Sequence, residues 1–283
     1  LAAAKHSQQQ EHYNRLLSDL EREFPATKMV ADAYLTRARW RGLQQDFTAA
    51  KQDYLYVLEN FSTYEPKEDL LYEYGHFLYN AKEWAEAKNI AHIFLQTTTE
   101  AKAKTLASKL LIASHQALYQ NGASAPAALA KDLEKVLQDD LCLTLAEKKQ
   151  YTYLLAETRY KEKKYTSSIK ILRELSQQNL AEPLQISCYL LLASNYEKIP
   201  SNDPLYCSYV EKVLALRPSH PLAGALHTRL FNAYLRQFQA TKEKKLLIAA
   251  REQLYLAQEK NGPIKKNNFL WLVDHYYKTI KTL

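Results

Sequence analysis

The chain has 283 residues, with five glycines, nine prolines, three cysteines and a formal net charge of +7. Five dispersed glycines exclude a glycine-rich phosphate loop, and cysteine spacings of 46 (188 − 142) and 19 (207 − 188) match neither a disulfide framework nor a zinc motif. The positive charge is spread along the chain, which is typical of a solvated surface and only slightly favours acidic partners.

The prolines favour an all-α fold, because each lies where a helix is expected to begin or end. No stretch shows the sustained alternation of Val, Ile and Thr that indicates strands. No apolar run reaches the roughly 18–20 residues that span a bilayer, and no signal peptide is visible. Because the chain begins at Leu1 and not at Met, we expect a fragment or a processed form, from which an upstream targeting or membrane segment could be missing.

Residues 31–95 contain two copies of one unit, a helix, a tight turn and a second helix. A repeat of this length is typical of proteins built from stacked helix pairs. Equivalent positions are 37 residues apart in three cases: Ala38 and Gly75 (75 − 38), Phe47 and Trp84 (84 − 47), and Ala50 and Ala87 (87 − 50).

This pattern resembles the tetratricopeptide repeat. That family has a small residue in the middle of its first helix, then an aromatic residue, two residues of any type and an Ala in its second helix. Small residues allow antiparallel helices to approach closely, and we expect Phe47 and Trp84 to plug the open ends of their helix pairs. Arg37 and Arg41 depart from the pattern, because the family prefers apolar residues there. The resemblance implies an all-α, right-handed α-solenoid of about six helix pairs.

Taken in order, the chain is expected to form a single solenoid domain over 1–283. It would comprise an N-terminal helix at 1–23, repeats at 28–260 and a C-terminal capping helix at 264–281. The expected pairs are 28–44 with 47–61, 67–81 with 83–96, 100–119 with a helix that begins at Pro126, a fourth around Ala156 and Tyr165, a fifth whose second helix begins at Asp203-Pro204, and 221–239 with 242–260.

The later pairs deviate locally from the repeat pattern. Asn121-Gly122 indicates a longer turn in the third pair. In the fourth pair, Ser168 replaces the expected Ala, and Thr166 or Ser167 is the expected N-cap. In the fifth pair, Tyr206 is near a position that favours a small residue, so different packing is expected there.

The sequence contains no pattern that indicates catalysis or metal binding. The histidines are scattered, and although His76 and His92 could lie on facing helices, no third ligand follows at a metal-binding spacing. We therefore expect no catalytic residues, no metal and no cofactor, and interpret the chain as not being an enzyme.

Tyrosine is abundant, with 21 residues, and suits both cores and binding surfaces because its ring carries a polar tip. The resemblance implies that first-helix residues line a concave inner face, and we expect the partner site on pairs two to four. Any single tyrosine could equally pack against the next repeat. The expected partner-binding residues are Arg39, Tyr72, His76, Tyr79, Asn80, Tyr153, Glu157, Tyr160, Tyr234 and Phe238.

The leading hypothesis is a non-enzymatic interaction scaffold that holds a peptide or protein surface in its concave groove. One subtype of the family binds a chaperone's C-terminal carboxylate through inner-face Lys, Arg and Asn side chains. That set is absent here, because the equivalent positions are Leu35, Arg39 and Leu43, followed by Tyr72, His76 and Tyr79.

Phe24-Pro25, Asp53-Tyr54 and Phe61 loosely resemble bacterial cell-envelope repeat proteins of the outer-membrane assembly and Tol-Pal accessory kind. This resemblance favours the periplasm or cell envelope, with the cytoplasm as the alternative. One rival function is a nucleic-acid-binding helical solenoid, which the net charge suggests, although the regular side-chain code of RNA-reading repeats is not visible. Another rival is a ligand- or peptide-sensing domain of a longer regulator.

Overall fold

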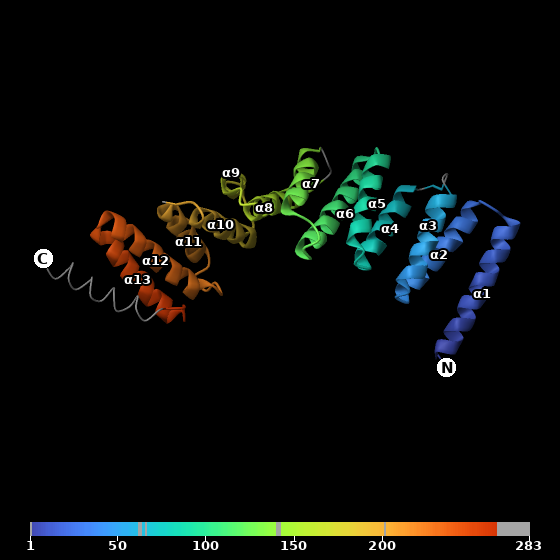
Figure 1. Ribbon diagram of the computed structural model, residues 1–283, viewed down its shortest axis with the longest axis horizontal. Coiled ribbons are helices and arrows are strands. Elements are labelled where there is room, and N and C mark those ends of the chain that lie inside the picture. The colour runs from blue at the N-terminus through green and yellow to red at the C-terminus, as the bar shows by residue number, and fades with distance from the viewer. Residues whose placement is uncertain (1, 62–63, 66, 140–142, 201, 265–283) are drawn as a thin grey trace. The chain divides into compact units, whose positions relative to one another are not determined.

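The computed structural model (Figure 1) describes all residues except 1, 62–63, 66, 140–142, 201 and 265–283. The described residues form thirteen α-helices and no strand, so the predicted all-α fold class is confirmed. The helices are α1 (Ala2–Glu23), α2 (Lys28–Leu43), α3 (Phe47–Asn60), α4 (Lys67–Asn80), α5 (Trp84–Thr97), α6 (Ala101–Gln120), α7 (Pro126–Gln138), α8 (Leu145–Lys161), α9 (Tyr165–Ser176), α10 (Glu182–Glu197), α11 (Asp203–Leu216), α12 (Ala223–Thr241) and α13 (Lys244–Glu259).

The chain divides into two compact units, Leu1–Leu143 and Thr144–Leu283. The first contains α1 and the hairpins α2/α3, α4/α5 and α6/α7, with α6 packed on both α4 and α5. The second contains α8/α9, α10/α11 and α12/α13, in which α10 packs on α9 and α12 on α11. These hairpins follow the predicted helix pairs. The single solenoid domain and its handedness stay predictions, and the capping helix expected at 264–281 lies outside the described residues apart from Ile264.

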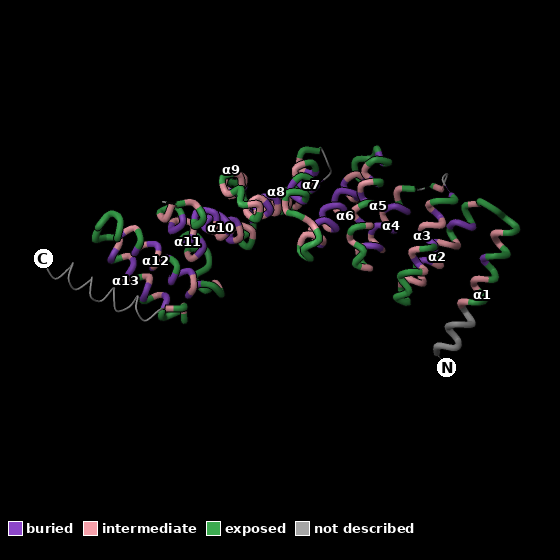
Figure 2. Tube along the Cα trace, viewed as in Figure 1, coloured by how far each residue is buried: buried purple, intermediate pink, exposed green. Residues whose placement is uncertain are grey.

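The small residues of the repeat pattern lie where helices approach closely. Ala38, Ala50 and Ala87 are fully buried, and a Cβ on Gly75 would lie 2.3 Å from Cδ2 of Leu110 in α6. Figure 2 shows buried and exposed residues alternating along the helices, as expected when one face of each helix packs on its neighbours. The 37-residue register therefore predicts the close contacts of α4 correctly.

The turns of the first, second and fourth pairs share one backbone conformation. Each has a non-glycine residue with a left-handed φ of 62° to 65° at its centre, namely Gln45, Lys82 and Lys163. In each, the next residue's amide reaches back to a carbonyl in the last turn of the preceding helix: Asp46 to Arg41 at 3.0 Å, Glu83 to Leu78 at 2.9 Å, and Lys164 to Arg159 at 2.9 Å. This is the Schellman arrangement that terminates helices, in which glycine is usually preferred.

The third pair has the longer turn that the sequence predicts. Gly122 takes the left-handed position, with φ of 73°, and residues 121–125 separate the two helices. Two local expectations were wrong. Phe47 does not plug its helix pair, because its side chain is 40% exposed and its ring lies 6.0 Å from that of Phe77. Neither Thr166 nor Ser167 caps α9, because the N-cap residue is Lys164 and no side chain caps this end.

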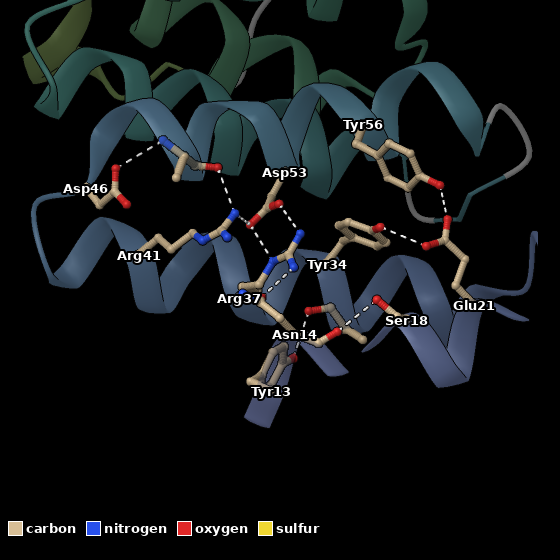
Figure 3. Close-up of polar contacts among 12 residues, drawn as sticks. Tyr13, Asn14, Ser18, Glu21, Tyr34, Arg37, Arg41, Asp46, Asp53 and Tyr56 are labelled. Atoms are coloured by element: carbon tan, nitrogen blue, oxygen red, sulfur yellow. Dashed lines mark hydrogen bonds and ion pairs between the residues drawn. The ribbon is translucent and has the colours of Figure 1, made fainter. Parts of the chain in front are cut away.

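An ionic cluster lies inside the first unit, where α2 packs on α3 (Figure 3). Asp53 is 2% exposed and accepts two hydrogen bonds from Arg37, at 2.7 and 3.0 Å, and one from Arg41, at 2.7 Å. Arg37 also donates to Asn14 of α1, and its guanidinium lies 4.8 Å from the centre of the Tyr34 ring. The two arginines that depart from the repeat pattern are therefore the partners of a buried carboxylate.

A second polar group lies next to this cluster and connects the first three helices. Glu21 of α1 accepts hydrogen bonds from the hydroxyls of Tyr34 and Tyr56, whose rings lie 4.3 Å apart (Figure 3). Burial and the bond to Glu21 raise the pKa of Tyr34, so its hydroxyl remains a donor at neutral pH. These contacts fix α1 against the first hairpin.

Candidate partner-binding hollows

A surface hollow of about 680 Å³ lies in the first unit between α2 and α4. We call it the α2–α4 hollow. It lies between the first helices of neighbouring pairs, the helices that the repeat resemblance assigns to the inner face. Its lining residues are Arg39, Gly42, Leu43, Phe47, Tyr54, Asp69, Tyr72, Glu73, His76, Phe77 and Asn80.

The α4 side of this hollow follows from helical spacing. Asp69, Tyr72, His76 and Asn80 follow one another at steps of three or four residues, and Glu73 is four residues after Asp69 and three before His76, so all five lie along one side of the helix. The Tyr72 ring lies 4.4 Å from the His76 ring, nearly edge-on. Burial lowers the pKa of His76, so the imidazole is neutral at pH 7. This wall therefore combines aromatic surface, neutral hydrogen-bonding groups and two carboxylates.

Glu73 is the most strongly bound side chain of the hollow. It accepts two hydrogen bonds from Arg39, at 2.7 and 2.6 Å, and one from the Tyr54 hydroxyl at 2.7 Å. Burial acts to raise the pKa of Glu73, but the bonds from Arg39 and Tyr54 outweigh it and hold the pKa below its ordinary value. Glu73 is therefore ionised at neutral pH, and it orients the Arg39 guanidinium.

Asp69 is the second carboxylate of the lining. It lies in the first turn of α4, where the helix dipole favours a negative charge. Its side chain is exposed, and it has no ion pair with any residue that the structure describes. Asp69 therefore offers an unneutralised carboxylate at the edge of the hollow.

The apolar part of the lining is partly open to solvent. Leu43, the last residue of α2, is 81% exposed, and Phe47 is 40% exposed. The Phe77 ring lies 5.1 Å from the Tyr54 ring, and a Cβ on Gly42 would lie 3.2 Å from it. Exposed apolar side chains that line a hollow are the groups expected to anchor an apolar side chain of a partner.

A second hollow, of about 690 Å³, lies in the second unit between the beginnings of α8 and α10. We call it the α8–α10 hollow. Its single ionised residue is Lys149, whose ammonium donates to the Asn179 carbonyl. Burial, followed by the charge of Glu157, raises the pKa of Tyr153 to about 12. The lining residues are Leu145, Ala146, Lys149, Gln150, Tyr153, Asn179, Ala181, Pro183, Leu184 and Ser187.

Four of the expected partner-binding residues meet in the α2–α4 hollow: Arg39, Tyr72, His76 and Asn80. Tyr79 does not line it, because its ring packs against Leu110 and Leu111 of α6. The packing alternative therefore describes Tyr79, whereas the other four residues share one surface.

The expected residues of the second unit are more scattered. Tyr153 lines the α8–α10 hollow, and the Tyr160 ring lies 5.6 Å from that of Tyr165. Glu157 lines neither hollow, and the Tyr234 hydroxyl donates to Glu211. Phe238 is buried with Leu247 and Leu254 in the core, so it offers no surface to a partner and was wrongly placed on the inner face.

Several lining residues were not among the expected site residues. Asp69 and Glu73 were missed although their helical spacing with Tyr72 and His76 was visible in the sequence. Phe47 was missed because the repeat pattern predicted that it plugs the open end of its helix pair. Apart from Tyr153, the lining of the α8–α10 hollow was not expected from the sequence, because the hollow forms where two helices begin.

Three side chains, Ser124, His115 and Asp132, are hydrogen-bonded in the same sequence as a Ser-His-Asp catalytic triad. His115 bonds Asp132 through Nδ1 at 2.6 Å and Ser124 through Nε2 at 2.7 Å. Burial acts to raise the pKa of Asp132, but its bond to His115 outweighs it and lowers the pKa, so the ionised carboxylate accepts a hydrogen bond from the Nδ1–H group. His115 is 2% exposed, and the group joins α6, α7 and the long turn between them. We interpret it as a structural clasp of this hairpin.

The described residues contain no group of three His, Cys, Asp or Glu side chains that could hold a metal ion. Cys188 and Cys207 are buried free thiols, as expected for core residues, and burial raises the pKa of each to about 12. Among the described residues, no helix is long and apolar enough to cross a membrane.

No protein-family model matches the sequence, and a search of curated proteins finds no match. Among solved structures, the fold is similar to YrrB, described as a TPR protein with an unusual peptide-binding site, at 15% identity and a TM-score of 0.49, covering 73% of this chain and 95% of that one. It is also similar to pilF of Pseudomonas aeruginosa, at 19% identity and a TM-score of 0.42, covering 84% and 94%.

A third similar structure is Nro1, a hypoxic regulator of sterol synthesis described as a nuclear import adaptor, at 12% identity and a TM-score of 0.49, covering 95% of this chain and 99% of that one. At these identities and TM-scores, the three likenesses carry no conclusion about function for this chain.

Proposed function

We propose that this protein is a non-enzymatic interaction scaffold that holds a peptide or an extended protein segment in the α2–α4 hollow. The observation that carries the proposal is the convergence of Arg39, Tyr72, His76 and Asn80 around one hollow. Two helices of different hairpins position these side chains in one lining with the exposed apolar residues Leu43 and Phe47. Aromatic and arginine side chains beside exposed apolar residues are typical of the residues that dominate protein interfaces.

Photo-crosslinking tests where the partner binds. Benzoylphenylalanine is introduced at Leu43, which is 81% exposed in the hollow, and at Ile248 of α13, a matched control that is 41% exposed in the second unit. The account predicts that the Leu43 position captures a discrete protein in cells and the Ile248 position does not. Equal capture at both positions would contradict it, and capture of RNA at Leu43 would favour the nucleic-acid rival.

The non-enzymatic part of the proposal is tested at the Ser124–His115–Asp132 clasp. A serine activated by His and Asp reacts with fluorophosphonates, as catalytic serines do. We expect Ser124 to remain unlabelled in intact protein, as judged by mass spectrometry. A stoichiometric adduct that is lost in Ser124→Ala would contradict the proposal. The bacterial cell-envelope location and the sensor alternative stay predictions from the sequence.

A further inference from the structure

We propose that the α2–α4 hollow takes a basic segment, in which an apolar side chain is next to a Lys or Arg. This inference rests on the proposed function and adds the chemistry of the partner. Arg39 is the one cation of the lining, whereas Asp69 and Glu73 supply two carboxylates. The lining therefore has a net charge of −1 (1 − 2), although the whole chain carries +7. Charge complementarity of this kind selects partners and orients them.

Arg39 is already paired with a carboxylate inside the hollow, so its charge is balanced before any partner binds. Its Nε and Nη2 both donate to Glu73, at 2.7 and 2.6 Å, in the two-pronged geometry that a partner carboxylate would need. A partner carboxylate that approached this same edge of the guanidinium would have to displace Glu73, which also accepts from the Tyr54 hydroxyl at 2.7 Å. His76 adds no positive charge, because burial keeps it neutral at pH 7.

A basic partner, in contrast, meets free groups. Asp69 is exposed and has no cation beside it in the described part of the chain. The aromatic rings of Tyr72 and Phe47 line the same hollow, and such rings attract ammonium and guanidinium groups over their faces. The partner's apolar side chain would contact Leu43 and Phe77, and its cation would lie towards Asp69.

The α8–α10 hollow provides a control of similar volume and opposite charge. It measures about 690 Å³ against about 680 Å³, and its one ionised lining residue is Lys149. A basic segment that merely prefers any apolar hollow would bind in both. A segment selected by charge would bind between α2 and α4.

The experiment uses the full chain and two blocked peptides, acetyl-Lys-Leu-Phe-Lys-amide and acetyl-Glu-Leu-Phe-Glu-amide. These peptides have the same apolar centre and opposite charge. Each is titrated to millimolar concentration while NMR follows the signals of His76 and Asn80 in one hollow and Gln150 in the other. We expect the basic peptide to shift the His76 and Asn80 signals and to bind several-fold more tightly there than the acidic one.

Two substitutions test whether Asp69 causes the preference for the basic peptide. Asp69→Asn removes the free carboxylate without burying a group, and we expect binding of the basic peptide to weaken about threefold to fivefold, as for one exposed ion pair. Lys149→Gln in the other hollow should leave that binding unchanged.

Tighter binding of the acidic peptide between α2 and α4 would overturn the basic preference and leave the proposed function standing. Absence of any shift of His76 and Asn80 with either peptide would also overturn the inference. Crosslinking at Leu43 would then decide the proposed function separately.

Discussion

The two units build similar hairpins around different interiors. In the first unit, a charged carboxylate, Asp53, lies in the middle of α3 and is enclosed by Arg37 and Arg41. In the second unit, the comparable ion pair lies at a turn, where Glu162 binds Arg159 at 2.6 Å and Lys164 at 3.1 Å. The second unit's interior is mainly apolar and includes two buried thiols.

One buried polar group of the second unit is a small hydroxyl. Ser168, which takes the position of the expected Ala, donates to the Ala156 carbonyl at 2.8 Å and accepts from Asn195 at 3.0 Å. A hydroxyl at this position therefore connects three helices at little cost in volume. The comparison teaches that a polar residue which departs from the repeat pattern is tolerated when a facing helix supplies its hydrogen-bonding or ionic partner. The charge of that partner then decides how much stability is lost when the interaction is removed.

The largest expected effect is at Asp53. Asp53→Ala leaves two arginines uncompensated in the packing of α2 on α3, and removing one partner of a buried ion pair typically costs about 3–5 kcal/mol. Urea unfolding measures the loss. Ser168→Ala in the second unit serves as the control and should cost only about 1 kcal/mol. Equal losses would remove the distinction between the two units.

A combined variant sharpens the same comparison. Replacing Arg37, Arg41 and Asp53 together by leucines removes the charges along with their partner. Buried ion pairs replaced by apolar residues of similar volume are often neutral in stability. We expect the triple variant to be clearly more stable than Asp53→Ala in the same urea assay. A triple variant as unstable as Asp53→Ala would show that the charges themselves are needed.

The next effect concerns close helix contacts. Gly75→Leu forces a side chain into the space of Leu110 and should cost about 1–3 kcal/mol. In the second unit, even Gly262→Ala should be poorly tolerated, because its Cβ would lie 2.3 Å from the Gly224 carbonyl oxygen, which is backbone and cannot rotate away. Thermal unfolding measures both. Wild-type melting of Gly75→Leu would show that the repeat register is wrong.

A smaller effect is expected from the pH dependence of the Arg39–Glu73 pair. The folded pKa of Glu73 is below its ordinary value, so the pair contributes stability above the unfolded pKa and loses it as the pH falls through the folded pKa. Both side chains are partly exposed, so the contribution is about 0.2–1 kcal/mol. Glu73→Gln should show a shallower loss of stability in acid than the wild type. Identical acid unfolding curves would contradict this assignment.

The smallest expected effect is at a turn. Lys82 holds φ at 65°, where a non-glycine residue is strained by about 1 kcal/mol. Lys82→Gly removes this strain but raises the conformational entropy of the unfolded chain. The free energy of unfolding should therefore rise by only about a few tenths of a kcal/mol. Chemical unfolding with replicate midpoints measures it. A clear loss of stability would mean that the Lys82 side chain makes a contact that outweighs its backbone strain.

Much of the fold could be predicted from the sequence, because helix ends are marked locally. Proline at the start of α7 and Asp203-Pro204 at the start of α11 predict helix starts that the structure has. Arg37 and Arg41 were recognised as departures from the pattern, but their partner Asp53 lies 16 and 12 residues away, and only the packing of α2 on α3 identifies it.

The site could be predicted only in part. The repeat register finds the helices that line the α2–α4 hollow, and this suffices for Arg39, Tyr72, His76 and Asn80. The register does not predict the direction of a large aromatic side chain when another helix lies nearby. Tyr79 packs on α6, and Phe238 packs in the α12/α13 core. The direction of such rings depends on contacts between hairpins, which no single helix encodes.

The most direct test of the partner surface is the affinity of the partner captured at Leu43 for two matched variants, Leu43→Ser and Ile248→Ser. Leu43 suits this test better than Tyr72 or Tyr79, because both rings are half-buried in packing whereas Leu43 is 81% exposed. The account predicts that Leu43→Ser keeps the wild-type melting temperature and weakens binding by roughly thirtyfold, as for an anchor residue, while Ile248→Ser binds as the wild type does. Unchanged affinity of Leu43→Ser would contradict the assignment of the α2–α4 hollow as the partner site.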